Sequence, residues 1–99
     1  MARDLLILEI AEDEISEAFD WYEQKVAGLG AEFAEELNLT LSNIITDPFL
    51  SNEVYSSFRR ALLNRFPYKI WYEIEDDIIV VWAVVHVKRH PNFWKKRLT

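Results

Sequence analysis

The chain has 99 residues, 51% of them hydrophobic and 28% charged, which is the composition of one folded domain, residues 1–99, with a single core. The sequence contains no cysteine and two histidines, so disulfide frameworks and thiolate metal sites are excluded and we expect neither a metal nor a cofactor. No apolar run approaches the roughly 20 residues that a membrane span needs. The first apolar stretch is interrupted at Glu9, so we expect no signal peptide, no membrane contact and a cytoplasmic location.

Charge is distributed unevenly along the chain. The net charge is −6, but residues 1–53 have a net charge of −11 and residues 54–99 a net charge of +5. We interpret the acidic half as solvated helix surface. The basic side chains of the second half alternate with aromatic ones, which favours contact with a polyanion or an acidic partner, although a solvated basic rim is the ordinary alternative.

The first half predicts a strand followed by two helices. Large apolar side chains over 5–10 predict a strand that is buried on both faces or nearly so. Apolar residues then recur at helical spacing over 11–27, with Asp13 as a candidate N-cap, and again over 29–45. Gly28 can adopt the left-handed conformation that ends the first helix. So short a turn predicts two antiparallel helices.

The second half predicts three strands after an irregular, polar segment at 49–57. The strands are expected over 58–63, 68–75 and 78–86, with a tight hairpin turn at Asp76-Asp77 between the last two. The strand over 78–86 is apolar on both faces, which indicates a central strand covered on both sides. Alternation along 68–75 places two sets of side chains on opposite faces: Ile70, Tyr72 and Ile74 on one, and Lys69, Trp71 and Glu73 on the other.

The predicted fold is therefore α+β, with the element order β-α-α-β-β-β and a helical hairpin packed on one face of a mainly antiparallel sheet. The helices can cover only one face of that sheet. The other face needs aromatic side chains of the same chain or a partner to cover it, and we expect this face, with its cationic rim, to be left uncovered for another macromolecule.

Several short motifs follow one another in a characteristic order, and with the element order they resemble the RelE/ParE superfamily of type II toxin–antitoxin toxins, once called plasmid stabilisation proteins. The resemblance covers residues 5–97 and depends on the order of the motifs rather than on any single one. The motifs are Phe19-Asp20-Trp21-Tyr22-Glu23-Gln24, Gly28-Leu29-Gly30 followed by Phe33, Asp47-Pro48, Arg59-Arg60-Ala61-Leu62-Leu63, Arg65-Phe66-Pro67-Tyr68, residues 81–86, and Arg89-His90-Pro91 with Trp94.

The resemblance implies one of two activities. RelE-type toxins cut mRNA in the ribosomal A site without a metal, using basic residues to stabilise the transition state. ParE-type toxins inhibit DNA gyrase by binding, with no chemical step of their own. Both types are held silent by a cognate antitoxin whose own N-terminal part usually binds DNA, so we expect an antitoxin partner and no direct DNA binding by this chain alone.

The ParE-like branch is favoured here. RelE-type nucleases commonly place a tyrosine near the C-terminus, whereas the last tyrosine of this chain is Tyr72 and the tail offers Phe93 and Trp94. A net charge of −6 also opposes approach to ribosomal RNA. The alternatives are a RelE-like, ribosome-dependent, metal-independent endoribonuclease and a non-toxic interaction module with the same fold.

Three groups of candidate site residues follow. Arg65, Lys69 and Arg89 are expected to cluster by a hairpin end, and Arg59 and Arg60 must point to opposite faces because they are adjacent on a strand. His86 ends the central strand, where an imidazole suits acid–base work near neutrality or simply hydrogen-bonds a neighbour. The predicted sets are Arg59, Arg65, Lys69, Arg89 and Trp94 for target binding; His86, Arg89 and Arg65 for catalysis in a nuclease; and Trp21, Trp71 and Tyr72 for antitoxin binding.

Overall fold

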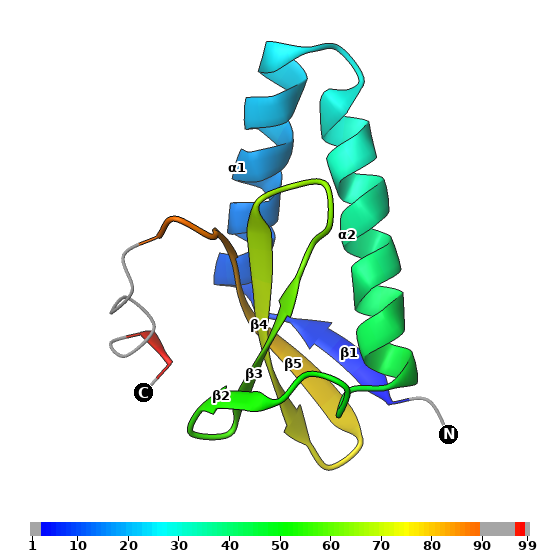
Figure 1. Ribbon diagram of the computed structural model, residues 1–99, viewed down its shortest axis with the longest axis vertical. Coiled ribbons are helices and arrows are strands. Elements are labelled where there is room, and N and C mark those ends of the chain that lie inside the picture. The colour runs from blue at the N-terminus through cyan, green and yellow to red at the C-terminus, as the bar shows by residue number, and fades with distance from the viewer. Residues whose placement is uncertain (1–2, 90–96, 99) are drawn as a thin grey trace.

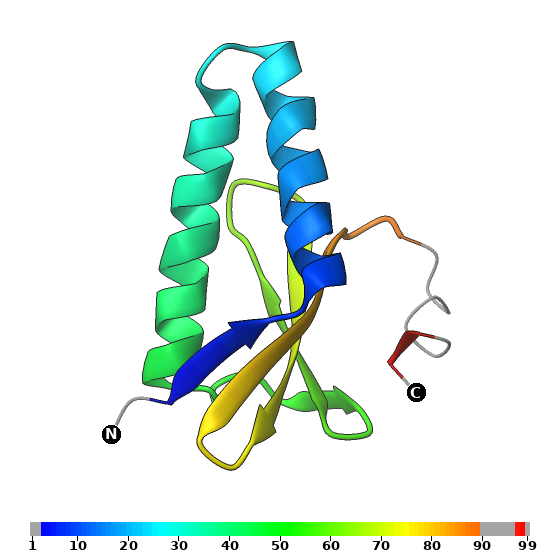
Figure 2. The same ribbon diagram turned by 180° about the vertical axis from the view of Figure 1, so that it is seen from behind.

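The computed structural model describes residues 3–89 and 97–98, and it contains the α+β fold that the sequence predicts (Figure 1). A helical hairpin packs on one side of a five-stranded sheet (Figure 2). The elements in chain order are β1 (Asp4–Ile7), α1 (Glu9–Lys25), α2 (Leu29–Thr46), β2 (Glu53–Tyr55), β3 (Phe58–Leu62), β4 (Tyr68–Glu75) and β5 (Ile78–His86).

The sheet has the strand order β1-β5-β4-β3-β2. The N-terminal strand β1 is parallel to β5, and all the other neighbours are antiparallel. The predicted tight turn at Asp76-Asp77 joins β4 to β5, and Asp76 adopts a positive φ of 51° there. The long β4–β5 pair therefore lies inside the sheet, with β1 on one side of it and β3 and β2 on the other.

The main core lies between the helices and the sheet. Its aromatic part is a group of four rings contributed by α1, α2, the β3–β4 loop and β4: Tyr22, Phe33, Phe66 and Tyr68. The ring centroids of Tyr22 and Phe66 are 4.8 Å apart and those of Phe33 and Tyr68 are 5.2 Å apart, both in edge-to-face geometry. These contacts fix the helical hairpin against the end of β4.

The alternation predicted for β4 is confirmed. Ile70 and Tyr72 belong to the core beneath the helices, whereas Trp71 belongs to a second cluster on the opposite face. In β5 a bulge interrupts the alternation, because Trp71 pairs with Ala83 but Tyr72 pairs with Val81, which leaves Trp82 as an extra residue.

The helical hairpin depends on two glycines and one carboxylate. Gly28 has a φ of 87°, the left-handed conformation that the sequence predicts. The Glu23 carboxylate of α1 accepts hydrogen bonds from the Gly28 and Gly30 N–H groups, at 2.8 and 3.0 Å, and so caps α2. A Cβ at Gly30 would lie only 2.7 Å from the Phe19 carbonyl oxygen, so α1 and α2 meet here backbone to backbone.

Three local predictions for the chain were wrong. The strand β1 lies at the sheet edge with Leu6 50% exposed, so it is not buried on both faces. Helix α1 begins at Glu9 after Leu8, which supplies no side-chain cap, so Asp13 lies inside the helix. The segment at 49–57 contains the edge strand β2, which is too short for its alternation to be visible in the sequence.

The face of the sheet away from the helices is closed at its centre by the chain itself. Trp71, Ala83 and Val85 are buried there, and Leu98, only 5% exposed, packs into the same cluster. The expectation that this face stays uncovered for a partner is therefore wrong at its centre. The cause is a contact between the C-terminal end and the middle of the sheet, which local periodicity does not reveal.

Within the described part of the chain, no helix has both the length and the apolar character needed to cross a bilayer.

Substituting Gly30 with alanine tests the close approach of the helices. We expect Gly30→Ala to lower the free energy of unfolding by about 2 kcal/mol, because overpacking against a backbone oxygen outweighs the gain in helix propensity. Urea denaturation measures the change. Ser42→Ala on the exposed side of α2 is the control and should stay within about 0.5 kcal/mol of the parent. An equal or higher stability for Gly30→Ala would contradict the packing argument.

Candidate functional site

Two cationic side chains meet over a tryptophan on the sheet face away from the helices. Arg60 on β3 is the direct neighbour of Trp71 on β4, and its Cζ lies 5.7 Å from the centre of the indole ring. The Nζ of Lys69 lies 5.8 Å from the same centre. The Trp71 side chain is fully buried and therefore rigid, so it holds both cations at a defined place. We call Arg60, Lys69 and Trp71 the cationic cluster.

Burial and the neighbouring positive charge lower the pKa of the lysine in the cationic cluster. Lys69 is only 8% exposed, and its pKa is lowered first by this burial and then by the positive charge of Arg60. An anionic group of a partner placed beside Arg60 would relieve this repulsion. The cluster is thus suited to bind a carboxylate or phosphate of another macromolecule.

Sequence reasoning named Lys69 for target binding but left Arg60 out of the set. It placed Arg59 and Arg60 on opposite faces, which is confirmed, but for target binding it grouped the wrong one of the two, Arg59, with Lys69. The strand register decides which of them lies with Lys69, since Arg59 is opposite Tyr72 and Arg60 opposite Trp71.

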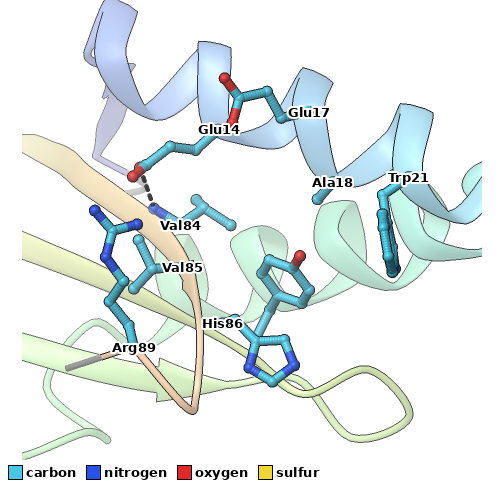
Figure 3. Close-up of a pocket in the computed structure, with 9 residues that line it drawn as sticks. Glu14, Glu17, Ala18, Trp21, Val84, Val85, His86 and Arg89 are labelled. Carbon is cyan, nitrogen blue, oxygen red and sulfur yellow. Dashed lines mark hydrogen bonds between the residues drawn. The ribbon is translucent and has the colours of Figure 1, made fainter. Parts of the chain in front are cut away.

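A separate cleft of about 350 Å³ lies between α1 and the end of β5 (Figure 3). His86 and Arg89 line it from the sheet side, and Trp21 and Glu17 line it from the helix side. The ring of His86 packs edge-to-face on Tyr68, with centroids 5.4 Å apart. The structure thus brings together two of the three predicted nuclease residues, His86 and Arg89.

Hydrogen bonding and burial set the chemistry of the cleft. The Nδ1 atom of His86 accepts a hydrogen bond of 3.0 Å from the Lys88 N–H, so the proton of the neutral ring lies on Nε2. The pKa of Tyr68 is raised, first by burial and then by the negative charge of Glu17. Of the two roles that the sequence suggested for His86, the structure thus shows the ordinary one, a hydrogen bond to a neighbouring residue.

Two predicted target-binding arginines are held by their own chain. Arg65 donates from Nη2 to Glu32 on α2 at 2.8 Å. Arg59 donates from Nη1 to the Ser51 carbonyl at 2.6 Å, and its guanidinium lies 5.0 Å from the ring centre of Phe49. The predicted cluster of Arg65, Lys69 and Arg89 is wrong, because the three side chains lie in three different places. Arg65 lines an acidic hollow on α2, and Lys69 belongs to the cationic cluster. Arg89 lines the cleft between α1 and the end of β5, which we call the strand-end cleft.

The predicted antitoxin-binding residues differ in accessibility. Trp21 is 55% exposed on α1, with the Lys25 Nζ 4.2 Å from its ring centre, and it stays a prediction. Trp71 and Tyr72 are buried on opposite sides of the sheet, so neither offers a surface to a partner in this fold. Tyr72 also donates a hydrogen bond of 2.7 Å to the Pro48 carbonyl within the core. Trp94 lies outside the described residues.

No group of three or more His, Asp or Glu side chains in 3–89 and 97–98 is arranged to hold a metal ion.

Replacing Lys69 with methionine tests the burial of its charge. The folded chain lowers the Lys69 pKa below the ordinary value of 10.5, so the unfolded chain binds more protons in the window just below that value. Parent stability should therefore rise with pH through this window. We expect Lys69→Met to be more stable than the parent at neutral pH and to lose that advantage in alkaline buffer.

Urea denaturation at neutral and at alkaline pH measures both effects, with Lys88→Met at an exposed position as the control. If Lys69→Met is less stable than the parent by the same amount at both pH values, burial of the Lys69 charge does not destabilise the folded chain.

Solved structures of similar fold are known at low sequence identity. A chain of the chromosomal ParDE TA system from P. aeruginosa superposes with a TM-score of 0.77 at 10% identity, covering 86% of this chain and 96% of that one. A mutant of the E. coli toxin RelE in the free state, with two arginines changed to alanine, gives a TM-score of 0.74 at 18% identity, covering 99% and 96%. No family model matches the sequence, and no curated protein matches it either.

The element order, the one-sided helical hairpin and the strand order of this chain are thus those of structures from both toxin branches, over nearly the whole length of each. The chain has the fold of the RelE/ParE superfamily of toxins.

Proposed function

We propose that this protein is the toxin of a type II toxin–antitoxin module, that it is ParE-like, and that it inhibits DNA gyrase by binding and is neutralised by a cognate antitoxin. The likeness in fold to ParDE and RelE structures supports the toxin assignment. The arrangement of the basic side chains supports binding over chemistry.

One observation carries the choice of branch. Metal-free RNA cleavage requires a base, an acid and cations that converge on one phosphate. Here His86 is the sheet neighbour of Tyr68, which packs against the core beneath the helices, whereas Lys69 and Arg60 lie on the opposite face. Arg65 is bound to Glu32. Arg60, Lys69 and Arg65 therefore do not converge on the cleft that holds His86 and Arg89, and the cationic cluster is better suited to hold a partner's anionic group.

A RelE-like ribonuclease is the second candidate. Its support is the strand-end cleft, where His86 and Arg89 lie beside Tyr68 and could serve an RNA strand as acid–base group, cation and stacking surface. A non-toxic interaction module is the outcome if neither activity is found.

Induced expression in bacteria tests the proposal and separates the candidates. We expect growth arrest with a DNA-damage response, filamentation and intact mRNA. Arg60→Ala should raise the inducer dose for half-maximal arrest about tenfold, the effect of losing one charged contact. Lys88→Ala, which removes an exposed cation that is not a member of the cationic cluster, is the control and should leave the dose unchanged.

Arrest with cleaved mRNA and no DNA-damage response would instead establish the nuclease. Full activity of Arg60→Ala would remove the cationic cluster from the binding surface. No arrest by the parent chain, with the protein present and folded, would leave only the interaction module.

A second pair of variants compares the strand-end cleft with the C-terminal tail. Arg89→Ala should weaken growth inhibition more than Lys96→Ala does, because Arg89 lines the cleft beside His86. The inducer dose for half-maximal arrest measures both. Equal effects would remove the reason to favour the cleft over the tail.

A further inference from the structure

Strand β2 covers only the first part of the outer side of β3 (Figure 1). The two strands pair at Glu53 with Arg59 and at Tyr55 with Phe58, and the register shifts between these pairs. Over 60–62, no strand of the described chain pairs with the outer side of β3. We call this segment the β3 edge. An open edge of this kind is a template for a further strand.

The backbone groups of Leu62 point outward from the β3 edge. The Leu63 N–H donates to the Tyr68 carbonyl at 3.0 Å, so the Leu63 N–H faces β4. Because successive residues of an antiparallel strand face opposite neighbours in turn, the N–H and the carbonyl of Leu62 face away from β4. Both groups are therefore placed to bond a strand that lies along this edge.

A cleft of about 310 Å³ lies against the β3 edge, between β3 and the last turns of α2. Arg60 and Leu62 line this β3 cleft from the strand, Asn43 lines it from the helix, and Leu50 lines it from the segment after α2. The side chains of Leu62 and Leu50 are 58% and 78% exposed. An occupant of the cleft would remove this apolar surface from water. Exposed leucines beside an open peptide edge favour a polypeptide over a nucleic acid as the occupant.

The charges beside the β3 edge favour an acidic occupant. Arg60 belongs both to the β3 cleft and to the cationic cluster, and Leu62 is the direct strand neighbour of Lys69. A carboxylate brought between these two cations would relieve the repulsion between them. Asp47 also lines the cleft, so the acidic side chains of an occupant belong on the sheet face away from the helices, where Arg60 and Lys69 lie.

We propose that the β3 edge accepts, as an added strand, an extended acidic segment of the protein that this toxin inhibits, with a carboxylate of that segment between Arg60 and Lys69. This proposal rests on the function proposed above, in which the inhibited protein is DNA gyrase. It deepens that function by assigning the main-chain edge of β3, and not only its cations, to the binding surface.

Two variants of opposite charge at position 62 test the acidic occupant. Leu62→Glu places a carboxylate beside Lys69, where it neutralises this cation and repels the occupant, so the affinity for purified DNA gyrase should fall about tenfold. Leu62→Lys adds a cation at the same exposed position and should leave the affinity unchanged or raise it up to about threefold. Biolayer interferometry of the full-length chain with gyrase, without DNA, measures both. Leu6→Glu, on the half-exposed edge strand β1, is the control and should bind like the parent.

A proline at position 62 tests strand addition itself. Because the Leu62 N–H faces away from β4, Leu62→Pro removes this donor and leaves the β3–β4 ladder intact. Leu62→Ala loses the same apolar side chain but keeps the N–H, so it is the matched control. We expect Leu62→Pro to bind gyrase about fivefold more weakly than Leu62→Ala does, the effect of one lost hydrogen bond. Urea denaturation checks that both variants are folded.

The outcomes separate this inference from the function on which it rests. If gyrase binds the parent but binds Leu62→Glu as tightly as Leu62→Lys, or Leu62→Pro as tightly as Leu62→Ala, the inference is wrong and the proposed function stands. The inference is also wrong if these differences appear with duplex DNA, or with the protein encoded beside the gene, and not with gyrase. If the parent neither binds gyrase nor causes a DNA-damage response, the proposed function is wrong and the inference falls with it. Should Leu62→Pro fail to fold, the pair of opposite charge decides.

Discussion

The two-residue alternation of β4 is the constraint on which the rest of the structure depends. Because successive side chains point to opposite faces, Ile70 and Tyr72 pack beneath the helices while Lys69 and Trp71 face away from them. A slip by one residue would bury the lysine under the helices and expose the core. The position of the cationic cluster is therefore a direct consequence of how the core is filled.

Two parts of the sheet are left open by its regular neighbours and closed by other side chains: the face away from the helices and the half of β5 that β1 does not reach. A single helical hairpin can cover one face only, and a short β1 can pair with half of β5. The remainder is closed by Leu98 on the far face and by Glu14 with Arg97 along that half of β5. Apolar packing at Leu98 and charge pairing at Arg97 come from adjacent residues, so one end of the chain closes both openings.

Local patterns predicted the regular elements because each pattern has a local physical cause. The helical spacing of apolar residues, the left-handed freedom of Gly28 and the alternation of 68–75 each act within one element, and each is confirmed. The edge position of β1 was missed, because an apolar run looks the same in an edge strand and in a central one. The aromatic candidates at 71 and 72 were misjudged for a related reason, since residue type does not state which aromatic side chains the tertiary fold buries.

By itself, the sequence determined the element order, the antiparallel hairpin, the two faces of β4 and the likeness to RelE and ParE toxins. These depend on periodicity and on turn residues, which act over a few positions. Only the tertiary structure decided which cations lie together. Arg60 joins Lys69 through strand register, Arg65 is bound to Glu32, and Arg97 reaches Glu14 across most of the chain length. Such pairings depend on how strands and helices are placed in space, and a side chain's charge carries no information about that placement.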